Sequence, residues 1–182
     1  MKNIVLIGFM GTGKSSIGRR LARRLGRPFL DTDAEIERLT GKTVDRIFAE
    51  DGEVRFRSEE RLLCAKLSRP QGLVVATGGG MVLNPENVRL LQAGGVLIAL
   101  RADPETIYRR VRRKRTRPLL RGDLRERIAV LLRQRQGVYA VAEFSVDTGL
   151  LTIDHAVGRI LGYLKERHGI EDAGTDCTAG PS

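Results

Sequence analysis

The chain has 182 residues, of which 32 are Lys or Arg and 22 are Asp or Glu, giving a formal net charge of +10. This length predicts one domain with a sizeable core, and the hydrophobic fraction of 41% excludes a chain that is disordered throughout. The positive charge first suggests a nucleic acid or an acidic membrane as partner. It is concentrated in residues 101–135, which hold 13 basic and 4 acidic side chains, so a functional interpretation must account for that segment.

Short apolar runs alternate with longer segments of helical periodicity, a pattern typical of a parallel sheet with helices on both faces. Between the first two apolar runs, Ile17, Leu21 and Leu25 recur on one face of a helix that ends near Gly26. We expect an α/β fold with five strands, at Asn3–Ile7, Pro28–Asp31, Gly72–Thr77, Gly95–Leu100 and Phe144–Thr148.

Capping residues mark most of the other helices. Thr43 and Thr152 are N-cap candidates, and Asn84-Pro85 and Asp103-Pro104 each join an N-cap to a proline in the first turn. Helices are expected at 32–39, from 43, at 53–68, from 84, and at 105–111, 124–136 and 152–168. Residues 112–123 break the periodicity, no linker is evident, and we expect one domain over 1–168 followed by a disordered tail over 169–182.

Signals for disulfides, zinc and membranes are weak. Cys64 and Cys177 lie far apart, which argues against a disulfide framework or a zinc site. No apolar run approaches the ~20 residues of a membrane span. The apolar start of the chain is short for a secretory signal and runs straight into a glycine motif. We therefore expect a cytoplasmic protein with no membrane partner.

A phosphate-binding motif follows the first expected strand, because residues 8–15 match G-x-x-x-x-G-K-[ST]. Glycines let backbone N–H groups approach phosphate oxygens, and the following helix N-terminus adds positive charge. Lys14 would reach the β- and γ-phosphates, and the Ser15 hydroxyl would ligate Mg²⁺. The expected ATP-binding residues of this segment are Gly11, Thr12, Gly13, Lys14, Ser15 and Ser16.

Two alternatives exist for these glycines. One is a plain glycine turn. The other is a dinucleotide-binding fingerprint, for which Asp31 and Asp33 lie near the expected ribose-binding offset. That fingerprint requires a glycine where Ser16 stands and gives Lys14 no role, so the sequence favours a nucleoside triphosphate.

The phosphate loop does not by itself distinguish an ATPase, a GTPase and a small-molecule kinase. The chain has no guanine-reading Asn-Lys-x-Asp run, and the apolar run at 73–76 leads to glycines 78–80 instead of a metal-holding Asp. Asp31 and Asp33 follow the second strand and would share one side of it if the strand continued. One carboxylate could support Mg²⁺ and the other could accept the proton of a substrate hydroxyl. The simpler alternative is that Asp33 only caps the next helix.

The set of motifs resembles that of the shikimate kinase family, over about residues 1–165. The residues that follow the phosphate loop in the family's order are Asp31-Thr32-Asp33, Phe56-Arg57-x-x-Glu60, Gly78-Gly79-Gly80, Arg117-Pro118-Leu119-Leu120 and Arg135-x-x-x-Tyr139. The resemblance implies transfer of the ATP γ-phosphoryl group to the 3-hydroxyl of shikimate. It also implies a P-loop, nucleoside-monophosphate-kinase-like fold with parallel strand order 2-3-1-4-5, helices on both faces and a mobile lid.

The resemblance also implies residue roles in the acceptor site. Asp33 would bind the shikimate hydroxyls and is the candidate base, while Asp31 would support Mg²⁺ from its outer sphere. Arg57 and Arg135 would clamp the shikimate carboxylate, and the backbone of Gly79 and Gly80 would face the ring. The substrate-binding helices would lie at about 32–61.

Two further arginines would act on the nucleotide. Arg117, in a lid at about 109–123, would contact the ATP phosphates and serve catalysis together with Lys14 and Asp33. Arg110 would pack on the adenine. A lid that closes over ATP would exclude water from the reaction, which gives the basic segment a function.

The residue chemistry supports these roles independently of the resemblance. Guanidinium groups pair bidentately with a carboxylate, and Glu60 lies one helical turn after Arg57 and can orient it. A flat ring can approach a glycine backbone closely. For both clamp arginines, the alternative is an ordinary surface charge.

Some features depart from the family pattern. Gln136-Gly137 stands where a proline is expected after Arg135, and the loop at 147–152 has no recognisable nucleotide-contacting signature. Other small-acceptor kinases, for gluconate or a nucleotide, remain the nearest alternative. A nucleic-acid-binding protein is disfavoured by the aromatic content of 4% and the lack of a reading motif. We expect a monomer that binds ATP, Mg²⁺ and shikimate.

Overall fold

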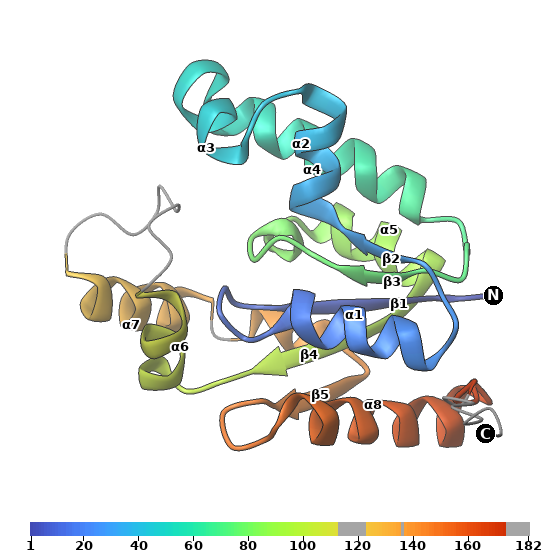
Figure 1. Ribbon diagram of the computed structural model, residues 1–182. Helices are drawn as coiled ribbons and strands as arrows, with labels where there is room; N and C mark the ends of the chain where they lie inside the picture. The colour runs from blue at the N-terminus through green and yellow to red at the C-terminus, as the bar shows by residue number, and fades with distance from the viewer. Residues whose placement is uncertain (113–122, 136, 174–182) are drawn as a thin grey trace, which may run out of the picture.

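The computed structural model describes residues 1–112, 123–135 and 137–173. Its sheet has five parallel strands in the order β2-β3-β1-β4-β5, as predicted (Figure 1). The strands are β1 (Asn3–Gly8), β2 (Phe29–Asp31), β3 (Val74–Ala76), β4 (Gly95–Arg101) and β5 (Phe144–Asp147). β3 is shorter than predicted because Gly72 adopts a left-handed turn with φ of 73° and the chain leaves the ladder after Ala76.

The α-helices are α1 (Lys14–Arg24), α2 (Thr32–Thr40), α3 (Val44–Arg46), α4 (Gly52–Leu67), α5 (Pro85–Gly94), α6 (Pro104–Val111), α7 (Leu124–Gln134) and α8 (Ile153–His168). A π-turn, η1 (Ile47–Asp51), and two 3-10 turns, η2 (Met81–Leu83) and η4 (Val138–Val141), complete the described elements. Thr43, Asn84, Asp103 and Thr152 each accept a backbone N–H at a helix N-terminus, so all four predicted caps are confirmed.

Alternation along β1 divides the core between the two faces of the sheet. Ile4 and Leu6 pack with α1 and α8 on one face, and Val5 and Ile7 pack with α2, α4 and α5 on the other. A third group joins Phe9 and Met10 to α6 and α7, two helices that lie side by side in Figure 1. Loops from both faces of the sheet therefore meet at the carboxyl ends of the strands.

The chain continues to contact the domain after α8. Ile170 packs against the α1 and α8 side of the core, and Asp172 forms an ion pair with Arg24. The N–H of Ala173 donates to the Arg24 carbonyl. Residues 169–173 therefore lie against the domain, and residues 174–182 lie outside the described residues.

The expected lid is described only at its two ends. Residues 109–112 belong to α6 and its C-cap, and Asp123 caps α7. Residues 113–122, which include Arg117, lie outside the described residues. Within the described ranges, no helix has the length and apolar character needed to cross a membrane.

Alanine substitutions at two helical glycines should change the free energy of unfolding in opposite directions. A Cβ at Gly94 would lie 1.9 Å from the Leu67 carbonyl oxygen, and backbone cannot move aside cheaply, so Gly94→Ala should lower the free energy of unfolding by more than about 2 kcal/mol. A Cβ at Gly158 in α8 would meet nothing within 4 Å. Gly158→Ala should therefore raise the free energy of unfolding by about 0.5–1 kcal/mol. Urea unfolding measures both variants, and equal effects would contradict the packing of α5 against the end of α4.

Candidate active site

The phosphate loop joins the end of β1 to the start of α1. Gly13 has a φ of 95° and is the N-cap of α1, and a Cβ at Gly11 would lie 2.8 Å from Val111 Cγ1 of α6. Lys14 is 9% exposed, and its ammonium donates to the Gly8 and Phe9 carbonyls at 2.8 and 2.9 Å. The fold therefore presents the α1 N-terminus and a buried ammonium to one point, as an anion site requires.

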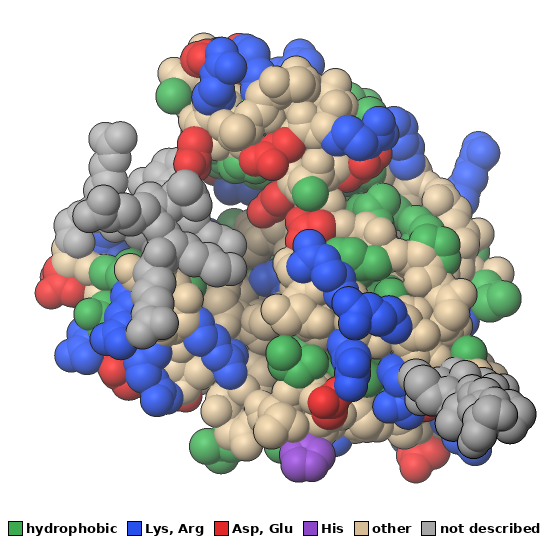
Figure 2. Space-filling model, viewed as in Figure 1, with side chains coloured by type: hydrophobic (Ala, Val, Ile, Leu, Met, Phe, Trp, Pro, Cys, Tyr) green, Lys and Arg blue, Asp and Glu red, His purple; other side chains and the backbone are tan. Residues whose placement is uncertain are grey.

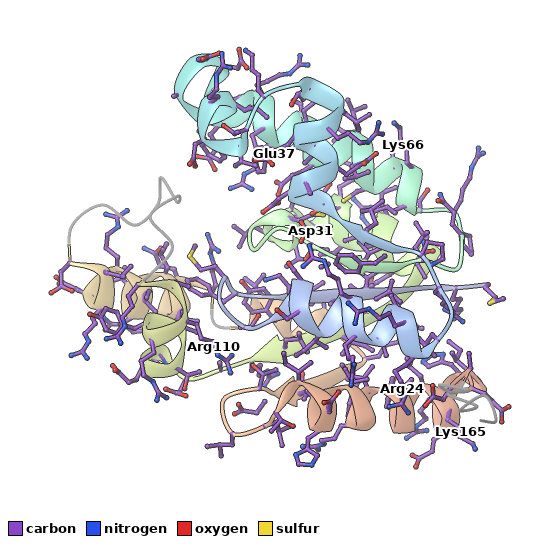
Figure 3. The ribbon with its side chains drawn as sticks, viewed as in Figure 1. Arg24, Asp31, Glu37, Lys66, Arg110 and Lys165 are labelled. Carbon is purple, nitrogen blue, oxygen red and sulfur yellow. The ribbon has the colours of Figure 1, made fainter. Side chains whose placement is uncertain are left out.

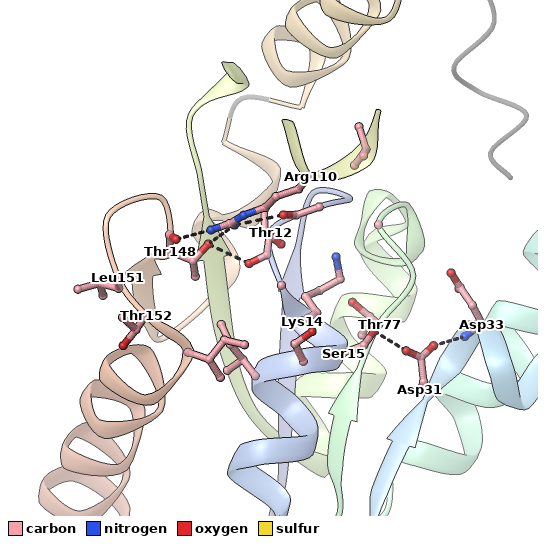
Figure 4. Close-up of a pocket in the computed structure, with 17 residues that line it drawn as sticks. Thr12, Lys14, Ser15, Asp31, Asp33, Thr77, Arg110, Thr148, Leu151 and Thr152 are labelled. Carbon is pink, nitrogen blue, oxygen red and sulfur yellow. Dashed lines mark hydrogen bonds between the residues drawn. The ribbon is translucent and has the colours of Figure 1, made fainter. Parts of the chain in front are cut away.

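A hydroxyl and a carboxylate lie directly beside this loop. Ser15 Oγ donates to Asp31 Oδ2 at 2.6 Å, while Asp31 Oδ1 accepts the backbone N–H of Asp33 at 3.2 Å (Figure 4). Asp31 is therefore the N-cap of α2. The alternative that Asp33 caps this helix is wrong. Strand alternation also does not align Asp31 and Asp33, because the strand does not continue: the chain turns into helix immediately after Asp31.

The three glycines after β3 lie against the side chains of α2 and α4. The N–H of Gly78 donates to the buried hydroxyl of Thr32 at 2.8 Å. A Cβ at Gly78 would lie 2.5 Å from Asp33 Oδ1, and a Cβ at Gly80 would lie 2.8 Å from Arg57 Nη1. Larger residues here would displace the two side chains, which is the structural reason for glycine at both positions.

Arg57 is held by two carboxylates on its own helix. Its guanidinium bonds Glu60 Oε2 at 2.7 Å and Glu53 Oε1 at 2.8 Å. Glu60 is only 1% exposed, and this burial raises the pKa of its carboxyl, while the ion pair with Arg57 opposes the rise. The predicted i,i+3 orientation of Arg57 by Glu60 is confirmed.

Arg135 is a buried cation at the end of α7, with 8% of its surface exposed. Its Nη1 donates to the Gly79 carbonyl at 3.2 Å, and its guanidinium carbon lies 5.4 Å from the centroid of the Phe9 ring. Within the described residues no ion pair of Arg135 is formed. A buried charge without an opposite charge is costly, so this position favours an anionic ligand.

At the opposite end of the site, Arg110 links the phosphate loop to the loop after β5. It donates to the Gly11 carbonyl at 3.2 Å and to the Thr148 carbonyl at 2.7 Å (Figure 4). The buried Thr148 hydroxyl accepts from Arg110 Nη1 at 3.1 Å and donates to the Thr12 carbonyl at 2.9 Å. Arg110 comes from α6 and Asp31 from β2, and both are labelled in Figure 3.

These elements enclose a cavity of about 500 Å³. Figure 2 shows the hollow on this face, with acidic side chains near its rim. Of the sequence-predicted residues, those that line the cavity are Gly11, Thr12, Gly13, Lys14, Ser15, Ser16, Asp31, Asp33, Gly79 and Arg110. Three more predicted residues lie beside the cavity. Gly80 lies next to the Arg57 guanidinium, and Arg135 donates to the Gly79 carbonyl.

Among the lining residues that the sequence analysis did not assign to the site, four come from the segment after β5, namely Thr148, Leu151, Thr152 and Ile153. They carry no phosphate- or base-binding motif. The available signal was their position immediately after the last strand, because ligands of open parallel sheets bind outside the carboxyl ends of strands.

A parallel sheet with a phosphate loop at its centre, and an acid- and arginine-containing pocket beside it, defines a P-loop kinase for a small acceptor. A family model described as shikimate kinase matches residues 10–165. The shikimate kinase of Desulforudis audaxviator is 68% identical over 180 residues, which cover 99% of this chain and 95% of the relative. That of Pelotomaculum thermopropionicum is 67% identical, over 94% of this chain and 100% of the relative.

A solved structure agrees with these matches. Shikimate kinase from Acinetobacter baumannii, in complex with shikimate, aligns with a TM-score of 0.87 and 36% identity, covering 92% of this chain and 95% of that one. A gluconokinase from Sinorhizobium meliloti, at 17% identity and a TM-score of 0.56, shares the fold alone. The chain belongs to the shikimate kinase family.

Removal of the Thr148 hydroxyl tests its role at the nucleotide end of the site. Thr148→Val keeps the shape but removes the bonds to Thr12 and Arg110, so the KM for ATP should rise by about 3- to 10-fold, the equivalent of one net hydrogen bond. The KM for shikimate should change less than about twofold, since the described hydrogen bonds of the Thr148 hydroxyl are with Thr12, Arg101 and Arg110. Steady-state kinetics measure both constants. Thr148→Ser, which keeps the hydroxyl, is the control, and an unchanged KM for ATP in the Val variant would contradict this role.

Proposed function

We propose that this protein transfers the γ-phosphoryl group of ATP to the 3-hydroxyl of shikimate, giving shikimate 3-phosphate and ADP. The observation that carries the proposal is the pocket beside the phosphate loop. Asp33 lines this pocket, and Arg57 and Arg135 lie beside it at the backbone of Gly78–Gly80. This set of groups matches a small ring that carries one carboxylate and several hydroxyls.

The two arginines bind the acceptor carboxylate in this proposal. Arg57 reaches it from α4 with its position fixed by Glu60, and Arg135 reaches it from the end of α7. A carboxylate bound to Arg135 supplies the opposite charge that this buried guanidinium otherwise lacks within the described residues. Paired guanidinium forks also fix the orientation of the ring, since each can donate two parallel hydrogen bonds.

Asp33 binds the acceptor hydroxyls from the first turn of α2. Its carboxylate lies against Gly78 and lines the same cavity as the phosphate loop, so a hydroxyl bound to it faces the transferred phosphoryl group. The carboxylate can accept the hydroxyl proton as the new P–O bond forms. Orientation alone would also accelerate the transfer, because phosphoryl transfer depends chiefly on position and charge stabilisation.

The nucleotide phosphates bind at the loop between β1 and α1. The backbone N–H groups around Gly11 and Gly13 and the α1 N-terminus receive the phosphate oxygens. Lys14 moves its ammonium from the Gly8 and Phe9 carbonyls to the phosphates and stabilises the charge that develops there. Arg110 contacts the adenine end beside Thr148, and Arg117 contacts the phosphates from the segment outside the described residues.

Mg²⁺ fits the hydroxyl and carboxylate beside the phosphate loop. Ser15 Oγ and Asp31 Oδ2 are 2.6 Å apart, and both are the hard oxygen ligands that Mg²⁺ prefers. The described residues hold no group of three or more His, Cys, Asp or Glu side chains suited to a metal. The phosphate-loop motif gives Ser15 as the direct protein ligand, and membership of the shikimate kinase family implies that Asp31 would act through water, with the ATP phosphates completing the shell. The ion supplies charge neutralisation on the phosphates.

We infer that the enzyme acts as a monomer in the cytoplasm, without a nucleic-acid partner. The described residues of this chain supply both the nucleotide side and the acceptor side of the site, and ATP is a cytoplasmic substrate. Two basic side chains of residues 101–135 lie at the site, where Arg110 serves the nucleotide and Arg135 serves the acceptor carboxylate.

An acceptor panel tests the proposed function. ADP release should be stimulated by shikimate and should stay near the acceptor-free rate with gluconate or AMP. Arg57→Ala should raise the KM for shikimate by the equivalent of about 2–5 kcal/mol, because the acceptor carboxylate loses a hydrogen-bonded charge. The KM for ATP should not change in this variant.

Arg61→Ala is the matched control. Arg61 is on the same helix but is exposed and pairs with Glu86 on the surface, so its removal should leave both KM values within about twofold. Absence of stimulation by shikimate would overturn the proposed function. An equal loss of ATP binding in Arg57→Ala would overturn the acceptor role of Arg57.

A further inference from the structure

The carbonyl of Gly79 accepts hydrogen bonds from two side chains. Arg135 Nη1 donates to it at 3.2 Å and Tyr139 Oη at 3.1 Å. A carbonyl oxygen has two lone pairs, so these two donors satisfy it fully. The shared carbonyl joins the acceptor-side glycine backbone to α7 and η4, the two elements that follow residues 113–122.

Tyr139 is firmly placed for this contact. Its ring packs against both the α2, α4 and α5 side of the core and the group formed by Phe9, α6 and α7. The turn that carries it is tied to α7 by the bond from the Val138 N–H to the Arg135 carbonyl at 3.1 Å. Burial raises the pKa of the Tyr139 phenol, so the group is a neutral donor at physiological pH.

The two donors differ in what substrate binding requires of them. In the proposed function Arg135 would turn its guanidinium to the acceptor carboxylate, and that turn would take Nη1 from the Gly79 carbonyl. A carbonyl in a ligand-filled site that loses its donor costs free energy. The Tyr139 hydroxyl has no competing role at the acceptor, so it can keep this carbonyl hydrogen-bonded throughout.

We propose that Tyr139 is a positioning residue whose hydroxyl holds the Gly79 carbonyl, so that Arg135 is released from that carbonyl to bind the acceptor carboxylate. The inference rests on the proposed function and deepens it. Without the hydroxyl, Arg135 is the one donor to this carbonyl within the described residues. It is then retained there, and shikimate must compete with the protein for its guanidinium.

The test compares two ligands on the intact enzyme. Shikimate carries the carboxylate, and its methyl ester has the same ring and hydroxyls without the negative charge. Tyr139→Phe should raise the Kd of shikimate by about 3- to 10-fold, measured by calorimetry, because one net hydrogen bond is lost on releasing Arg135. The Kd of the methyl ester should change less than about twofold, since the ester does not draw Arg135 from Gly79.

Tyr163→Phe is the control for removal of a tyrosine hydroxyl. Tyr163 stacks on Phe144 with ring centroids 4.4 Å apart, on the α8 side of the sheet, and both ligands should bind this variant as they bind the wild type. Equal weakening of the two ligands in Tyr139→Phe would show a general structural loss and overturn the inference. So would unchanged affinity for both.

Two further measurements separate this inference from the proposed function. Arg135→Ala should weaken shikimate by itself; if it does not, the clamp assigned to Arg135 is wrong, whatever the result for Tyr139. A crystal structure of the wild-type enzyme with shikimate is a test that does not depend on whether any variant folds. It should show Tyr139 Oη on the Gly79 carbonyl and Arg135 Nη1 on the carboxylate, and Arg135 still bonded to Gly79 would overturn the inference.

Discussion

The contact between the glycine backbone after β3 and the side chains of α2 and α4 is the constraint on which the site depends. Strand order 2-3-1-4-5 places the end of β3 between the ends of β2 and β1. The bond from the Gly78 N–H to Thr32 then fixes the glycine segment against the start of α2. Asp33 and the phosphate loop line one cavity, and Arg57 lies beside it at Gly80, because no side chain occupies the space at Gly78 and Gly80.

Charge in this protein is divided between paired surface groups and a few groups kept for ligands. Exposed arginines such as Arg38 and Arg46 form ion pairs along their own helices, and such pairs contribute little to stability. Arg57 is different, because the buried Glu60 fixes its position. Arg135 is the extreme case, a buried guanidinium on a carbonyl and an aromatic face. The net charge of +10 therefore tells less about function than the environment of two of its arginines.

Local patterns predicted much of this structure. The phosphate loop, the four helix caps and the strand order follow from motifs, periodicity and the resemblance to a known family. The prediction that failed was one that depends on where the chain turns from strand to helix. Asp31 ends β2 and caps α2 at once, so the alternation expected for Asp31 and Asp33 has no strand on which to act.

The other features that the sequence did not predict depend on contacts between segments that are distant in the chain. Thr148 lies in the site because the loop after β5 folds back on Thr12, 136 residues earlier in the chain. The bond between Tyr139 and Gly79 spans 60 residues and leaves no mark in either local sequence. Such contacts follow from the packing of the sheet and its helices, and sequence periodicity does not report them.

The most direct test of the account is the affinity of shikimate for Gly78→Ala. The added methyl group displaces the Asp33 carboxylate but meets only side-chain atoms, so the variant should fold. Calorimetry should give a shikimate Kd at least about tenfold weaker than that of the wild type, since a charged hydrogen bond is lost. Nucleotide affinity should stay within about twofold in Gly78→Ala and in the open helical control Gly162→Ala. A folded Gly78→Ala enzyme that binds shikimate as tightly as the wild type would contradict the account.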